Sequence, residues 1–194
     1  MTVSVCVFCG SQYGADPRYR AAAVRFGELA GAAGLHVIYG GGRVGLMGAI
    51  ADAAISAGAQ VTGLIPARLL EREVGHRAIS ELVVTRDMFE RKAQMIERAD
   101  AFVILPGGLG TLDELLEVET LRQLGYHDKP IVMINLDGYW DPYLALVERV
   151  IDQGFAAPSV RRLIAVVGEV EEALAELGVE AETPAPPLRA AQGD

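Results

Sequence analysis

Short apolar runs alternate with longer amphipathic stretches along most of the chain. A strand covered by helices on both faces of a sheet needs apolar side chains at every position. On this basis strands are predicted at 3–9, 35–39, 60–65, 82–85, 101–105, 131–134 and 163–167. Helices are predicted at 17–33, from the 40–48 loop to about 56, from 87 onward, and at 111–124, 143–153 and 170–177. This alternation predicts an α/β fold with a Rossmann-like, doubly wound, mostly parallel sheet flanked by helices.

The length suits one domain with a substantial core and leaves no room for a second. The chain has 194 residues, and 51% of them are hydrophobic. We expect a single domain over residues 1–179. Residues 180–194 contain T-P-A-P-P and many small side chains, so they are expected to form a disordered tail.

The most distinctive stretch follows the apolar run at 101–105. Its sequence, P-G-G-L-G, cannot continue a central strand, and its glycines let a ligand approach the main chain closely. A helix follows, with Thr111 as the expected N-cap. The first N–H groups of a helix are unpaired and lie at the positive end of its dipole, which predicts a site for phosphate or carboxylate. The residues assigned to this site are Gly107, Gly108, Gly110 and Thr111.

Glu114 and Glu117 are three residues apart and therefore lie on one face of that helix. An anion site beside two carboxylates suggests chemistry on a phosphorylated substrate. The alternative is a capping box, in which Glu114 only accepts a hydrogen bond from the amide of Thr111 and stabilises the helix by about 1 kcal/mol. The glycines favour the functional interpretation, because a cap alone does not need three of them.

Two cations fall on the inward side of the preceding helix. Lys92 lies within the arc of an apolar stripe that includes Met88, and Arg91 lies at its edge. Their charged ends could simply extend to solvent. However, helices that follow strands begin at the carboxyl edge of a parallel sheet. Arg91 and Glu114 should therefore overlook the same edge, which Ser11 also reaches.

Other short patterns carry less weight. Gly40, Gly42 and Gly45 match the dinucleotide fingerprint G-x-G-x-x-G, but they follow the second strand, and the next strand ends without an acid for a ribose hydroxyl. Cys6 and Cys9 form a C-x-x-C within the first strand. A separation of three sends their side chains to opposite faces, so we expect two buried thiols and no metal site.

Charge and hydropathy narrow the possible partners. The net charge of −9 argues against a nucleic-acid polymer, because phosphate backbones are bound by basic surfaces. The N-terminus lacks the basic region of a signal peptide, and no apolar run approaches the roughly 18 residues of a membrane span. We therefore expect a soluble cytoplasmic protein that does not bind membranes.

Five motifs occur together in this chain. P-G-G-L-G-T-L-D-E stands at 106–114, and the R-K pair at 91–92 precedes it. C-G-S stands at 9–11, Y-G-G-G-R-V-G-L-M-G at 39–48 and Q-L-G-Y-H-D-K-P at 123–130. Together they resemble the Lonely Guy (LOG) family of cytokinin riboside 5′-monophosphate phosphoribohydrolases, long mislabelled as lysine decarboxylases. The chain departs from the family's usual residues at Phe89, where a polar residue is common, and at Glu119, which replaces an apolar one.

The resemblance implies hydrolysis of the N-glycosidic bond of N6-modified adenosine 5′-monophosphates, giving free base and ribose 5-phosphate. It also implies a homodimer that requires no metal or organic cofactor. The family's catalytic pair corresponds to Arg91 and Glu114, and the chemistry agrees, because a carboxylate can stabilise the positive charge that develops on the sugar. The residues assigned to binding of the substrate and its phosphate are Gly107, Gly108, Gly110, Thr111, Lys92, Glu73, Ser11, Met88 and Glu117.

Three alternatives remain beside this interpretation. A decarboxylase that uses pyridoxal phosphate is disfavoured, because Lys92 and Lys129 are the only lysines and neither has an evident cofactor-binding setting. A non-catalytic nucleotide-binding module would use the same glycine loop without cleaving its ligand. The third alternative is a hydrolase that acts mainly on AMP or on other nucleoside monophosphates.

Overall fold

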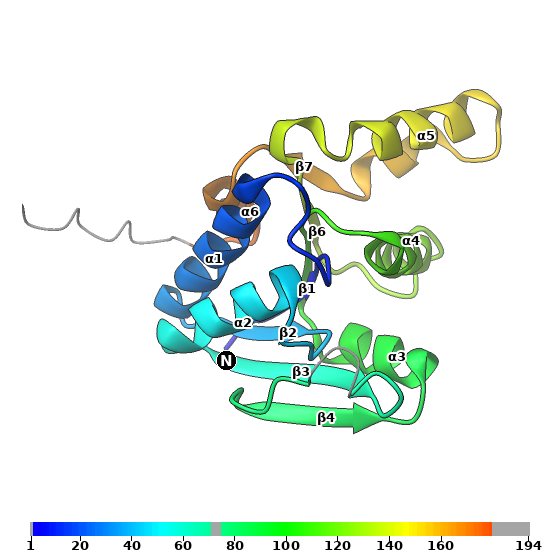
Figure 1. Cartoon of the computed structure of the whole chain (residues 1–194). Coiled ribbons are helices and arrows are strands. Elements are labelled where there is room, and N and C mark those ends of the chain that lie inside the picture. Colours follow the sequence, from blue (N-terminus) through cyan, green and yellow to red (C-terminus); the bar gives the residue numbers. More distant parts are fainter. Residues whose placement is uncertain (1, 71–74, 180–194) are drawn as a thin grey trace, which may run out of the picture.

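The structure is a computed structural model and describes residues 2–70 and 75–179. Within these residues seven strands form one sheet, with every neighbouring pair parallel, in the order β4-β3-β2-β1-β5-β6-β7 (Figure 1). The strands are β1 (Ser4–Phe8), β2 (His36–Tyr39), β3 (Gln60–Pro66), β4 (Glu81–Thr85), β5 (Ala101–Ile104), β6 (Ile131–Ile134) and β7 (Ala165–Val167).

Helices cover both faces of the sheet. Those in the described part of the chain are α1 (Pro17–Ala32), α2 (Gly45–Ser56), α3 (Met88–Arg98), α4 (Leu109–Gln123), α5 (Asp141–Asp152) and α6 (Val170–Glu176), with the short 3₁₀ helices η1 (Leu136–Gly138) and η2 (Pro158–Arg162). Helices α1, α2 and α6 pack on one face, and α3, α4 and α5 on the other (Figure 1). The predicted doubly wound, Rossmann-like fold is therefore confirmed.

The predicted elements are all present, but one boundary matters for the site. Helix α4 begins at Leu109 with Gly108 as its N-cap, so the prediction of Thr111 as the N-cap was wrong. Thr111 is the third helical residue, and its side chain is buried against Gly107. A single domain over 1–179 stays a prediction, and the predicted tail at 180–194 lies outside the described residues.

The two cysteines confirm the predicted alternation of side chains along β1. Cys6 packs in the core on the α3–α5 side, whereas Cys9 packs in the core on the α1–α2 side. Both are free and buried, and burial raises the pKa of each thiol. Neither thiol is therefore ionised at neutral pH, as a reactive or metal-binding cysteine would be.

Strand β1 lies where the sheet order reverses, with β2 on one side and β5 on the other. The loops that leave β1 and β5 meet at the carboxyl edge, where the N–H of Gly10 donates to the carbonyl of Pro106 at 3.1 Å. The loop after β2 joins them, because the N–H of Leu46 donates to the carbonyl of Gly10 at 3.0 Å. In open α/β sheets this crevice is where ligands bind.

Glu119 is a buried acid between α4 and α5. The hydroxyl of Tyr143 donates to its carboxylate. Burial raises the pKa of Glu119, although the bond from Tyr143 acts in the opposite direction. A raised folded-state pKa means that the folded state favours the protonated acid. Its contribution to stability is thus fully present below the unfolded pKa and is lost as the pH rises through the folded pKa.

Glu119→Gln should therefore raise the melting temperature at pH 7, and the gain should shrink towards pH 4. Glutamine stays neutral at both pH values, and its amide oxygen can still accept a hydrogen bond from Tyr143. Calorimetric melts of parent and variant across this range provide the measurement. A variant that is less stable than the parent at pH 7 would show that the charged carboxylate is the favoured form.

Candidate functional site

Arg91 and Glu114 form a buried ion pair at the carboxyl edge. Arg91 lies in the first turn of α3 and Glu114 in the second turn of α4. Nη2 of Arg91 donates to Oε1 of Glu114 at 3.1 Å, and the two side chains are only 7% and 8% exposed. The sequence analysis expected these residues to overlook one edge, and the structure places them in direct contact.

The buried pair also decides against the capping box. That interpretation needs Thr111 as the N-cap, but Thr111 lies three residues inside the helix. Glu114 is therefore too far along α4 to cap its first amides, and its carboxylate accepts from Arg91 instead. The capping-box alternative was wrong.

The N-terminus of α4 is exposed and lines the same cavity as this ion pair. The first backbone bond of the helix runs from the N–H of Leu112 to the carbonyl of Gly108 at 3.0 Å, so the preceding amides lie at the exposed positive end. A Cβ added to Gly108 or Gly110 would meet nothing within 4 Å. A Cβ on Gly107 would instead come within 3.0 Å of the Thr111 hydroxyl. Gly107 thus packs the loop, while the other two glycines leave its outer side free.

A cavity of about 200 Å³ lies over these groups, and we call it the charged cavity. It combines the ion pair with the amides at the start of α4 and with apolar side chains from α2 and α3. Its walls are formed by Cys9, Ser11, Met47, Leu69, Met88, Arg91, Gly108, Leu109, Gly110, Thr111 and Glu114. Most of the predicted site residues therefore meet here.

Lys92 and Glu117 do not line the charged cavity, and they form an ion pair with each other. Nζ of Lys92 is 2.8 Å from Oε2 of Glu117 and 2.9 Å from Oδ2 of Asp113. Burial alone would lower the pKa of Lys92, but these carboxylates outweigh it and the pKa is raised. A lysine that forms a Schiff base needs a lowered pKa. Lys129 is also engaged, donating to two backbone carbonyls at the end of α3. Neither lysine suits pyridoxal phosphate.

Glu73, predicted to contact the substrate, lies outside the described residues. His76, which follows in the described part of the chain, is held by hydrogen bonds to two other segments. The N–H of His76 donates to the carbonyl of Gly41 at 2.9 Å, and its ring nitrogen Nε2 lies 2.8 Å from Oδ1 of Asp52 on α2. These contacts anchor the chain next to the loop that follows β2.

Gly40 is a functional position that the sequence analysis missed. A Cβ at this residue would come within 3.0 Å of both Nη2 of Arg91 and Sδ of Met47. Nη2 is the atom that bonds Glu114, so glycine at 40 makes room for the ion pair. Gly45, at a φ of 64°, packs similarly against the main chain of Ser11. Gly40 and Gly45 thus have packing reasons that do not involve a dinucleotide.

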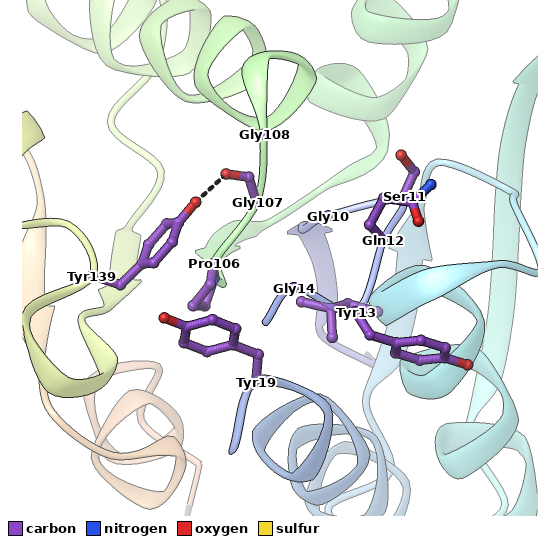
Figure 2. A pocket seen from close by; sticks show the side chains of 11 residues that line it. Gly10, Ser11, Gln12, Tyr13, Gly14, Tyr19, Pro106, Gly107, Gly108 and Tyr139 are labelled. Atoms are coloured by element: carbon purple, nitrogen blue, oxygen red, sulfur yellow. Dashed lines mark hydrogen bonds between the residues drawn. The ribbon is translucent and has the colours of Figure 1, made fainter. Parts of the chain in front are cut away.

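A second cavity, of about 230 Å³, lies next to the 107–108 loop. We call it the tyrosine cavity, and it shares Ser11 and Gly108 with the charged cavity. Gly107, one of the predicted phosphate-site residues, lines this cavity and not the charged one. Figure 2 shows the residues around it, which are Gly10, Ser11, Gln12, Tyr13, Gly14, Tyr19, Leu46, Pro106, Gly107, Gly108 and Tyr139.

The described part of the chain contains neither a group of side chains suited to a metal ion nor a membrane-spanning helix. Residues 2–70 and 75–179 hold no group of three or more His, Cys, Asp or Glu side chains placed to bind a metal ion. No helix in these same ranges is both long and apolar enough to cross a lipid bilayer.

Comparison with known proteins places these features in a family. A family model described as "Possible lysine decarboxylase" matches residues 47–177. Cytokinin riboside 5′-monophosphate phosphoribohydrolase LOG7 of Arabidopsis thaliana is 43% identical over 173 residues, which are 89% of this chain and 80% of that protein. The chain belongs to the LOG family. Among other relatives, the LOG enzyme of Oryza sativa subsp. japonica is 45% identical over 160 residues, covering 82% of this chain and 66% of the relative.

Solved structures show the same architecture in other proteins. This LOG-family chain matches the molybdenum cofactor binding protein of Rippkaea orientalis with a TM-score of 0.71 and 20% identity, over 92% of this chain and 96% of that one. The Moco carrier protein of Chlamydomonas reinhardtii gives 0.68 and 18%, with the same coverage. At such low identity these matches establish the shared fold and nothing about ligands.

Proposed function

We propose that this protein hydrolyses the N-glycosidic bond of N6-modified adenosine 5′-monophosphates to free base and ribose 5-phosphate. The bond between C1′ and the base nitrogen breaks, the oxygen of water bonds to C1′, and the base leaves with a proton. The curated relatives that carry this activity in their names support the reaction class. The observation that carries the proposal for this chain is the buried Arg91–Glu114 pair in one cavity with the open N-terminus of α4.

The 5′-phosphate would bind at the start of α4, on the amides near Gly108, Gly110 and Thr111. These amides carry no competing side chains, and the helix dipole favours an anion there. With the phosphate fixed, the ribose would lie over Glu114. Its carboxylate would stabilise the positive charge that develops on the sugar and would orient the attacking water.

Arg91 would hold both the carboxylate and the substrate. Its Nη2 already bonds Glu114, whereas Nε is buried with no hydrogen-bond partner in residues 2–70 and 75–179. A buried donor without a partner costs about 1–3 kcal/mol. A ribose hydroxyl or a base nitrogen in the charged cavity would provide that partner.

Gly40→Ala should lower kcat/KM by about 10², because moving catalytic groups by roughly 1 Å costs that much. The added methyl group would displace the Arg91 guanidinium, yet Gly40 is not among the positive-φ glycines, so alanine fits its backbone. In an Arg91→Ala background the same substitution should have no further effect. Gly168→Ala is the matched control, because its Cβ would meet only the Glu172 carboxylate at 3.8 Å. Equal losses in both backgrounds would contradict this role for Gly40.

We further propose a cytoplasmic homodimer. Large apolar side chains are exposed on the layer formed by α3, α4 and α5, including Phe89 at 80% and Leu109 at 85%. Leu116 of α4 and Leu146 of α5 add to this surface. Exposed apolar groups of this kind mark association sites. Light scattering should give twice the chain mass of 20.7 kDa, and a monomer at working concentration would contradict the dimer.

Product analysis with a panel of nucleoside monophosphates tests the proposed function. We expect ribose 5-phosphate to appear together with free base, fastest from an N6-modified adenosine 5′-monophosphate. Faster release from plain AMP or from another monophosphate would replace the proposed base preference. Tight binding of the whole panel without any release of base would favour the non-catalytic nucleotide-binding module.

A further inference from the structure

Two tyrosine rings that pack against each other form one wall of the tyrosine cavity. The rings of Tyr19 and Tyr139 meet edge to face with centroids 5.4 Å apart, and Trp140 supports Tyr139 at 4.9 Å. Gly14, at a φ of 76°, lies so close to the Tyr19 ring that an added Cβ would be 2.7 Å from it. These contacts hold both rings at the edge of the cavity.

The lining of this cavity contrasts with that of the charged cavity. None of the described residues that line it carries a charge. Its walls offer aromatic and aliphatic surface from Tyr19, Tyr139 and Pro106 (Figure 2) and from Leu46. The Ser11 hydroxyl and the Gln12 amide are its neutral polar groups. A phosphate or another ion would find no counter-charge here. An uncharged aromatic ring with a few polar atoms matches this chemistry.

Size and position restrict the ligand further. Sites for drug-sized ligands occupy about 300–1,000 Å³, so a cavity of about 230 Å³ suits a molecule of one or two rings. It opens between the loops that leave β1 and β5, the crevice in which α/β sheets bind ligands.

We propose that the tyrosine cavity is a second binding site, and that it takes a small, neutral aromatic heterocycle of the size of a purine base. The free base released by the proposed reaction belongs to this class, and in that respect alone the inference rests on the proposed function. The site differs from the one that cleaves the nucleotide, because the two cavities share only Ser11 and Gly108 and the Arg91–Glu114 pair lines the charged cavity alone.

A ligand in this cavity would contact the loop that serves the charged cavity. The hydroxyl of Tyr139 donates to the carbonyl of Gly107 at 2.5 Å (Figure 2). Gly107 in turn packs against Thr111 at the start of α4. A ligand that moves the Tyr139 ring would therefore also move the Gly107 carbonyl, which lies next to the start of α4.

Titration of the full chain with adenine tests the site. Trp140 is the only tryptophan, it is buried, and it contacts Tyr139, so its emission reports on the cavity. We expect a saturable change in emission that persists in Arg91→Ala and in saturating ribose 5-phosphate. Tyr19→Leu should weaken binding at least tenfold. Tyr126→Leu is the matched control, because this tyrosine is 77% exposed and lines neither cavity.

Calorimetric titration of Tyr139→Leu gives a second route if Tyr19→Leu does not fold, and it should show the same loss. The inference is overturned if adenine does not bind saturably, or if binding is unchanged in both tyrosine variants. It is also overturned if Arg91→Ala or ribose 5-phosphate abolishes binding, because adenine would then occupy the charged cavity. Hydrolysis is measured separately through release of ribose 5-phosphate, so failure of this site and failure of the proposed function are distinguishable.

Discussion

Glu114→Gln is expected to lower turnover by about 10² to 10⁴, the range for a positioned acid or base, while the fold survives. Glutamine has the same shape and can still accept a hydrogen bond from Arg91. It cannot carry the negative charge that opposes the developing charge on the sugar, nor can it take a proton from water. Steady-state kinetics on a nucleoside monophosphate, with a melting curve of the same sample, provide the measurement.

Glu148→Gln is the control for Glu114→Gln. Glu148 lies on α5 and lines neither cavity, and its carboxylate pairs with Arg161 at the surface. It makes the same chemical change without touching the charged cavity, so turnover should stay at the parent level. Near-parent activity of Glu114→Gln with only a lower melting temperature would mean that Glu114 has a structural role.

Arg91→Lys should behave nearly like Arg91→Ala, with activities within about tenfold of each other, because an ammonium group cannot replace a planar guanidinium. Nη2 and Nε of Arg91 are held in one plane by the guanidinium. Nη2 donates to Glu114, whereas Nε has no hydrogen-bond partner in the described residues. Lysine offers one nitrogen and would have to choose between the carboxylate and the substrate. Kinetics of both variants on the monophosphate test this.

Arg98→Lys supplies the matched control for the arginine substitution. Arg98 ends the same helix, and its guanidinium makes partly exposed contacts with Gln94 and Glu81. Surface contacts of this kind contribute little, so the control should keep parent activity. Near-parent activity in Arg91→Lys would mean that Arg91 acts only through its charge.

The sequence predicted the sheet and the shared edge of Arg91 and Glu114 for the same physical reason. A strand buried on both faces must be apolar throughout, as residues 101–104 are, and parallel strands fix where the following helices begin. Arg91 and Glu114 each follow a strand of this sheet, so the sequence could place both at one edge; it could not show that they touch, because β4 and β5 are not neighbours in the sheet. The family motif over 106–114 then added their roles.

Tertiary contacts explain what the sequence could not provide. The N-cap of α4 was misplaced because Gly108 starts the helix through its backbone alone, while the Thr111 side chain packs under Gly107. The role of Gly40 depends on its approach to Arg91, which is distant in the sequence. Likewise, nothing in the spacing of Lys92 and Glu117 revealed that they form an ion pair with each other and do not line the charged cavity.

The most direct test of the central claim is to quantify all products from a nucleoside 5′-monophosphate and from the matching nucleoside. Cleavage at the Arg91–Glu114 pair, with the phosphate on α4, predicts equal amounts of free base and ribose 5-phosphate from the monophosphate. The nucleoside should react at least about tenfold more slowly, since each charge-assisted hydrogen bond to phosphate is worth roughly 1.5–3 kcal/mol. Release of inorganic phosphate and nucleoside, or equal rates for the two substrates, would contradict the account.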